Sequence, residues 1–151
     1  MRVAVGAAPI RTGQTMYRAS IENQGDTRYL ATTRHSSFVM GTEGNGANPV
    51  DTLLAALGGC VGHYVRDFLR DRAIPAAGFQ VVLEASTTAD RSRLAGISVQ
   101  IDLGETQLDA ALEPELLAFI ERCPIHGTLR QASPIVAVLQ RRARAAVGTG
   151  R

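Results

Sequence analysis

Residues 48–72 read NPVDTLLAALGGCVGHYVRDFLRDR, and this stretch decides the fold. From Val50 to Arg72, leucine, valine and aromatic side chains recur at spacings of three and four residues, which is the spacing of one helix face. Asn48 followed by Pro49 is typical of a helix start, because asparagine caps the first N–H groups and proline fits the first helical position. We therefore predict one long helix from Val50 to about Arg72.

The first half of this helix is apolar on nearly every side, so we expect it to be completely enclosed. Its second half carries arginine and aspartate and can reach water. Gly58, Gly59 and Gly62 each cost about 1 kcal/mol relative to alanine inside a helix. Close approach by another backbone would explain these glycines, and so would room for a substrate beside Cys60.

Short strands and further helices are predicted on both sides of the long helix. Before it we expect strands over Thr15 to Asn23, Arg28 to Thr33 and Ser37 to Met40, then a glycine-rich loop over 41–47. After Pro75 we expect strands over Phe79 to Ser86 and Leu94 to Leu103, then a helix of about a dozen residues with an inner stripe of Leu112, Leu116, Leu117 and Ile120. The chain should finish with a helical turn over His126 to Gln131 and a strand over Pro134 to Gln140.

The composition excludes several classes of protein. A chain of 151 residues, 45% hydrophobic, suits one domain with an aliphatic core, because only 5% is aromatic. All sixteen basic residues are arginine, so lysine-dependent pyridoxal and P-loop chemistry is excluded. The small net charge of +2 and the scarcity of aromatic residues argue against nucleic-acid binding. We expect no membrane span and no secretory signal, and therefore a cytoplasmic protein.

The two cysteines, Cys60 and Cys123, are the residues best suited to chemistry. A cytosol keeps ordinary thiols reduced, so their value lies in packing or in reactivity. Cys60 lies in the apolar helix and would need an arginine to become a nucleophile. Cys123 precedes a proline at the start of a helical turn, where a thiol is more acidic. The alternative is that both are small buried hydrophobic residues.

A histidine follows each cysteine by three residues, as His63 and His126. Two such pairs could offer zinc two sulfurs and two nitrogens, but more than sixty residues separate them and the spacing matches no usual zinc signature. We therefore predict no metal site. His63 and His126 are expected to supply hydrogen bonds or to line the rim of a pocket, and His35 should be exposed.

Two motifs resemble the OsmC/Ohr family of osmotically induced and organic hydroperoxide resistance proteins. The first is residues 48–60, ending Gly-Gly-Cys, and the second is residues 123–129, beginning Cys-Pro. The resemblance spans about residues 15–140 and implies an α+β fold, with antiparallel sheets wrapped around long central helices in an intertwined homodimer. It also implies one domain over residues 1–151, with flexible ends at 1–12 and 141–151.

The resemblance implies a thiol-dependent reductase of organic hydroperoxides that uses no cofactor. Cys60 would be the peroxidatic thiolate, Cys123 the resolving thiol, and an external thiol or dithiol the reductant. The family's arginine follows the first strand, where this chain has Arg28, with Arg34 and Arg18 as alternatives. Studied peroxidases of the family have a glutamate where this chain has Val50. Asp51 cannot simply replace it, because one helical step rotates a side chain by about 100°.

A second function stays open. The chain could be a non-catalytic protein that binds a small apolar ligand in the pocket between subunits. Val50 would make that pocket more apolar, and the cysteines would then be inherited without a redox role.

Overall fold

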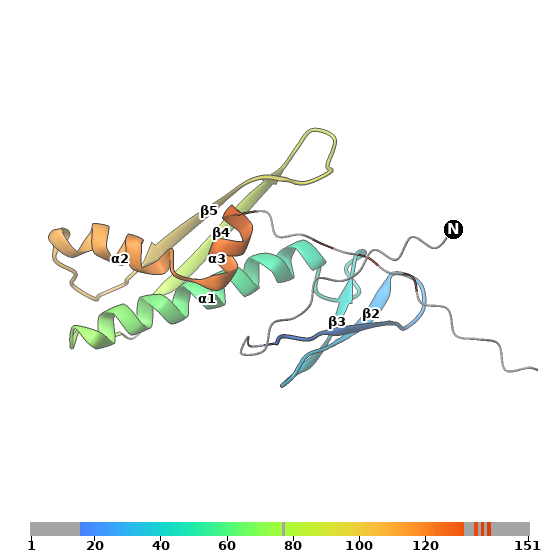
Figure 1. The fold of residues 1–151 in the computed structure, drawn as a ribbon, viewed down its shortest axis with the longest axis horizontal. Helices are drawn as coiled ribbons and strands as arrows, with labels where there is room; N and C mark the ends of the chain where they lie inside the picture. Colours follow the sequence, from blue (N-terminus) through green and yellow to red (C-terminus); the bar gives the residue numbers. More distant parts are fainter. Residues whose placement is uncertain (1–15, 77, 132–134, 136, 138, 140–151) are drawn as a thin grey trace, which may run out of the picture.

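The structure is a computed structural model that describes residues 16–76 and 78–131 and the single residues 135, 137 and 139. Along the chain lie β1 (Ser20–Asn23), β2 (Arg28–Thr32), β3 (Ser37–Gly41), α1 (Pro49–Asp71), β4 (Gln80–Thr87), β5 (Leu94–Asp102), the 3-10 helix η1 (Ala110–Leu112), α2 (Glu113–Ile120) and α3 (Pro124–Arg130). Figure 1 shows α1 alongside β4, β5 and α2, with the β1–β3 sheet beyond the start of α1. The predicted α+β class with antiparallel sheets is confirmed.

The first sheet is an antiparallel meander in the order β1-β2-β3. β1 begins at Ser20, whereas the alternating pattern predicted a strand from Thr15. The reason is the length of its partner: Ser20 pairs with Thr32, the last residue of β2, so the residues before Ser20 extend past the end of that strand. The two strands predicted from Arg28 and Ser37 are present within one residue of their expected ends.

One face of this sheet is apolar. Because side chains alternate along a strand and the register pairs Ile21 with Ala31 and Ala31 with Phe38, these side chains share a face, and Tyr29 and Met40 join them. Ile21 is 58% exposed, and only Ala31 among these residues is buried. The described part of the chain therefore covers this apolar face only in part: Ile21 is exposed, and Tyr29, Phe38 and Met40 are half-buried.

Local capping fixes both ends of α1. The Asn48 side chain accepts a hydrogen bond from the backbone N–H of Val50 at 2.8 Å, and Pro49 occupies the first turn, as the sequence predicted. The helix ends at Asp71, before Ala73, which has a positive φ of 55°. A residue in that left-handed conformation cannot continue an α-helix, so the chain turns before it reaches Pro75.

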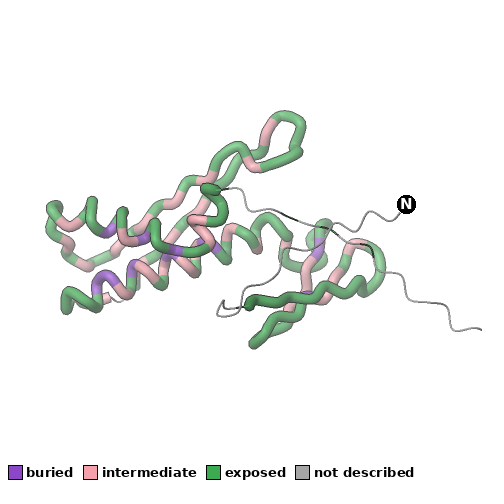
Figure 2. Tube along the Cα trace, viewed as in Figure 1, coloured by how far each residue is buried: buried purple, intermediate pink, exposed green. Residues whose placement is uncertain are grey.

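The core lies where α1 packs against β4, α2 and α3. In Figure 2 the buried positions concentrate along α1 and the helices beside it. The buried side chains of this cluster are Leu57, Val61, Val65, Phe68, Leu69, Leu116, Ile120 and Cys123. Arg72 adds a contact between helices, since its guanidinium lies over the Phe68 ring and pairs with Glu115 of α2 at 2.8 Å.

The expectation that the first half of α1 is completely enclosed is wrong for the single chain. Val50 is 43% exposed and Leu53 36%, and Ala55, Ala56 and Gly59 are also exposed. The sheet and the helices cover α1 from one side, so the opposite side of its first half stays open. Within the described ranges no other element encloses that side.

The three helix glycines have different surroundings. A Cβ on Gly58 would lie 2.7 Å from Leu83 Cδ1 of β4. The glycine therefore leaves room for the Leu83 side chain, not for the close approach of another backbone. Gly62 would make only ordinary contacts with Phe79 and Val81. A Cβ on Gly59 would meet no described atom within 4 Å outside its own stretch of helix backbone, so nothing in the described chain requires a glycine there.

The remaining predictions that fall on described residues agree with the structure except at Leu117 and at the start of α3, which begins at Pro124, two residues before the predicted helical turn. The strand pair is β4 and β5, and the expected dozen-residue helix is η1 followed by α2. Leu116 and Ile120 face the core, four residues apart, but Leu117 is 57% exposed because one helical step carries it off that face. No helix in the described ranges is long and apolar enough to cross a membrane. Only residues 135, 137 and 139 of the strand expected over Pro134 to Gln140 are described. The ends expected to be flexible, residues 1–12 and 141–151, lie outside the described residues.

Candidate functional site

A disulfide joins Cys60, in the middle of α1, to Cys123, which caps the start of α3. The two residues are 63 positions apart in the sequence, and their Cα atoms are 6.0 Å apart. This separation lies inside the limit of about 7 Å for a disulfide. The fold therefore brings the two motifs identified in the sequence into covalent contact.

The two sulfurs have different surroundings. Cys123 is only 1% exposed, and its sulfur accepts a hydrogen bond from the backbone N–H of His126 at 3.4 Å. Pro124 at the first helical position sets the chain direction that allows this contact. Cys60 is partly exposed. A reagent in solvent can therefore reach the Cys60 side of the bond more easily than the Cys123 side.

A groove of about 560 Å³ lies between the first half of α1, the start of β5 and α3. Its lining is mainly aliphatic, with two arginines and one histidine: Leu53, Leu57, Arg93, Leu94, Ala95, Gly96, Ile97, Val99, His126, Leu129 and Arg130. Leu57 lies one helical turn before Cys60, and His126 lies one turn after Cys123. One end of the groove is therefore next to the disulfide.

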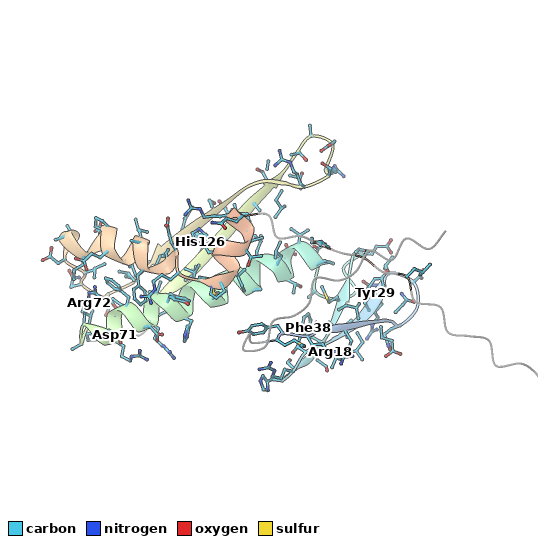
Figure 3. All side chains as sticks on the ribbon, in the orientation of Figure 1. Arg18, Tyr29, Phe38, Asp71, Arg72 and His126 are labelled. Carbon is cyan, nitrogen blue, oxygen red and sulfur yellow. A yellow bond between two sulfur atoms is a disulfide. The ribbon has the colours of Figure 1, made fainter. Side chains whose placement is uncertain are left out.

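The His126 imidazole lies on α3 (Figure 3) and lines this groove. Its Nδ1 atom is buried and has no hydrogen-bond partner among the described residues. A buried polar atom without a partner costs about 1–3 kcal/mol, so the ring is suited to receive a partner that enters the groove. The structure places His126 in the lining of a groove, and its predicted role in binding stays a prediction.

His63 is directed along α1 toward its charged half. Its ring is 56% exposed, and Nε2 lies 3.3 Å from the Asp67 carboxylate. Arg66 donates a hydrogen bond to Asp67 at 2.7 Å, and this bond, together with the positive charges of Arg70 and His63, holds the pKa of the Asp67 carboxyl below its usual value. His63 thus belongs to an exposed charge network, one turn beyond Cys60.

The predicted arginines and Asp51 lie apart from the disulfide in the single chain. Arg28 is exposed at the start of β2. Arg34 donates to the Met16 carbonyl oxygen at 2.7 Å. Asp51 is exposed in the first turn of α1. In the part of the chain that the structure describes, no arginine makes a hydrogen bond to either sulfur.

The zinc alternative gains no support from the described residues. Both sulfurs are bonded to each other. Within the described ranges, no three side chains of histidine, cysteine, aspartate or glutamate are grouped as a metal site requires.

With this geometry established, the family can be assigned. A family model for "OsmC-like protein" matches residues 41–138, which include both cysteines and the whole of α1. This chain belongs to the OsmC-like family. No curated protein matches this OsmC-like chain significantly by sequence.

Solved structures of other OsmC-like proteins share the fold. The OsmC-like protein from Mycoplasma pneumoniae has a TM-score of 0.69 at 16% identity, covering 78% of this chain and 89% of its own. The organic hydroperoxide resistance protein OhrB of Bacillus subtilis has a TM-score of 0.55 at 15% identity, with 78% and 93% covered. The organic hydroperoxide resistance protein OsmC from Legionella pneumophila has a TM-score of 0.54 at 18% identity, with 78% and 92% covered.

The sequence reasoning did not identify two arginines of this OsmC-like chain that line the groove. Arg93 is in the polar turn before β5, and Arg130 ends α3, where it pairs with Glu121 at 3.2 Å. Neither residue is part of a motif. Only the packing of α3 against β5 and α1 brings them to one groove, and no pattern in the sequence gives that packing.

Proposed function

We propose that this OsmC-like protein is a thiol-dependent reductase of organic hydroperoxides and that it acts in the cytoplasm. The observation that carries the proposal is the disulfide between Cys60 and Cys123, because a reductase of this kind must be able to form that bond in each cycle. The family assignment supports it, as do the two structural neighbours named for organic hydroperoxide resistance.

In the proposed cycle the Cys60 thiolate attacks the outer oxygen of the hydroperoxide. The O–O bond breaks, an alkoxide leaves and takes a proton to become the alcohol, and Cys60 becomes a sulfenic acid. The Cys123 thiol then attacks the Cys60 sulfur, which releases water and forms the disulfide. Two electrons from a dithiol, or from two thiols, restore both cysteines. No bound cofactor is needed for this chemistry.

The different exposure of the two sulfurs supports these roles. Cys60 is partly exposed, as the thiol that must meet the substrate has to be. Cys123 is nearly inaccessible and lies within bonding reach, which suits a thiol that reacts only with Cys60. Rapid disulfide formation also protects the sulfenic acid from further oxidation.

We further propose that the protein is an intertwined homodimer. The described residues cover the apolar face of the β1–β3 sheet only in part and leave one side of the first half of α1 open, and a large exposed apolar surface marks an interaction site. A second copy can cover both, because each copy offers the same two surfaces. Its sheet would also bring an Arg28 toward the helix of its partner, where Cys60 needs a guanidinium.

Replacement of Ile21 by aspartate should dissociate the dimer, because it places a charge on the apolar face of β1. Ser20→Asp is the matched control, since it adds the same charge to the same strand on the opposite face. Sedimentation velocity at equal protein concentration measures the effect. We expect a dimer for the unmodified protein and Ser20→Asp, and a monomer for Ile21→Asp. A dimer in all three would show that this face is not the interface.

The reductase proposal is tested by counting thiols. Reduced protein mixed with a small excess of cumene hydroperoxide should lose both free thiols and form one disulfide, and peroxide should be consumed in equal amount. Cys60→Ser should abolish the loss and leave Cys123 reduced. His35→Gln, in the exposed turn between β2 and β3, should react like the unmodified protein.

The second candidate function is non-catalytic binding of a small apolar ligand. The mainly aliphatic groove favours it, as does the distance of Arg28 and Arg34 from Cys60 in the single chain. Retention of both thiols in the presence of cumene hydroperoxide would support this function and reject the reductase.

A further inference from the structure

We propose that His126 donates the proton that converts the leaving alkoxide to the alcohol when Cys60 attacks a hydroperoxide. This inference rests on the proposed function and adds a catalytic residue to it. It starts from the groove that ends next to the disulfide and from the unpartnered nitrogen of the His126 ring.

The position of the groove determines where the leaving group lies. Leu57 borders the groove one turn before Cys60, so a hydroperoxide that reaches the Cys60 sulfur along the groove keeps its organic part among the leucines. The outer oxygen bonds to sulfur, and the inner oxygen stays attached to that organic part. The negative charge therefore develops on the groove side of the reacting atoms, where His126 lies.

The chemistry of the lining singles out His126 as the donor. Its aliphatic residues carry no transferable proton. Arg93 and Arg130 are the charged groups that share the groove, and a guanidinium is a poor proton donor in proteins. An imidazole exchanges a proton between about pH 5 and 8. Among the described residues that line the groove, only His126 carries an imidazole.

The lack of a hydrogen-bond partner for the ring nitrogen supports the same role. Nδ1 is buried and lacks a partner among the described residues, so the ring is not committed to a structural hydrogen bond through that atom. The Cys60 thiolate gains the outer oxygen, the O–O bond breaks, and the alkoxide takes the imidazolium proton. Solvent then returns one proton to the ring, so protons and electrons balance.

The test compares oxidants whose leaving groups differ. Cumene hydroperoxide releases an alkoxide, which needs a proton, whereas peracetic acid releases acetate, which does not. General acid catalysis contributes about 10²- to 10⁴-fold. We therefore expect His126→Gln to slow Cys60 oxidation by cumene hydroperoxide by roughly 100-fold, measured by stopped-flow in a single turnover, and to leave the rate with peracetic acid nearly unchanged.

Two further measurements distinguish proton donation by His126 from a structural role of this residue. His35→Gln is the matched control and should react with both oxidants like the unmodified protein. His126→Ala should regain its rate with cumene hydroperoxide when imidazole is added, which a merely structural role would not allow.

Equal slowing with both oxidants, or no slowing with either, would overturn the role of His126 while the reductase remains. If the unmodified protein fails to react with cumene hydroperoxide, the proposed function itself fails, and the role of His126 with it.

Discussion

Reduction of the Cys60–Cys123 disulfide is expected to lower the free energy of unfolding by about 4 kcal/mol. The bond closes a loop of 63 residues, and the loss of chain entropy in the unfolded state for a loop of that length gives a stabilisation of this size. The loop contains β4, β5 and α2, so the bond restrains most of the core-forming part of the chain.

The effect should be strongest at α3. None of its side chains is fully buried. Besides the disulfide and its partly buried residues, α3 is held by the exposed Arg130–Glu121 pair, and such pairs contribute only about 0–1 kcal/mol. The reduced protein should therefore release α3, and with it His126 and one wall of the groove, more easily than the oxidised protein.

Urea unfolding at one protein concentration, with and without a phosphine reductant, measures the difference. The control is the double variant Cys60→Ser, Cys123→Ser, whose stability should match that of the reduced protein and should not respond to the reductant. A difference below about 1 kcal/mol between the oxidised and reduced forms would contradict the loop-entropy argument.

The sequence was sufficient for the elements whose causes are local. The helix over residues 48–72 followed from apolar spacing and from the Asn48-Pro49 cap, and the structure places its start and end within one residue of the prediction. The β4–β5 hairpin followed from alternation and a polar turn. Each of these signals depends only on residues that are close together in the chain, so it can be recognised in a single sequence.

The predictions that were wrong depend on partners distant in sequence. The expected strand from Thr15 is shorter because β2 ends at Thr32, and alternation in one segment contains no information on the length of its partner. Leu117 was predicted to be a core residue because the apolar side chains of a short helix can form either of two neighbouring faces. Only the packing of α2 against α1 decides which of these faces is buried. Complete enclosure of α1 was expected from its composition, but the covering elements of one chain reach only one side.

The candidate site was predictable to a similar degree. The two motifs identified Cys60 and Cys123, and the structure joins them. The roles of Arg28, Arg34 and Asp51 stay predictions, since none of these residues reaches the disulfide within one chain. The groove with Arg93 and Arg130 had no signal in the sequence, because it forms where α1, β5 and α3 meet.

A small thiol should attack the Cys60 sulfur of the oxidised protein on the order of 100 times faster than the Cys123 sulfur. Cys123 is 1% exposed, so attack there requires local opening of the core, and an opening cost of about 3 kcal/mol corresponds to about a 100-fold lower rate. Attack on Cys60 also has the better leaving group, since the released Cys123 sulfur accepts the backbone N–H of His126.

The single-cysteine variants measure this preference directly. In Cys123→Ser the remaining thiol should react with a chromogenic disulfide reagent about 100 times faster than the thiol of Cys60→Ser, for the same reason of access. Urea should remove the difference, which separates burial from intrinsic reactivity.

The unmodified oxidised protein offers an independent measurement of the same preference. With a monothiol followed by rapid alkylation, its mixed disulfide should map to Cys60 by mass spectrometry, with the alkyl group on Cys123. A mixed disulfide on Cys123 would reverse the assignment of the two sulfurs. Cys123 would then have to meet the reductant, and α3 would have to leave the core in every cycle.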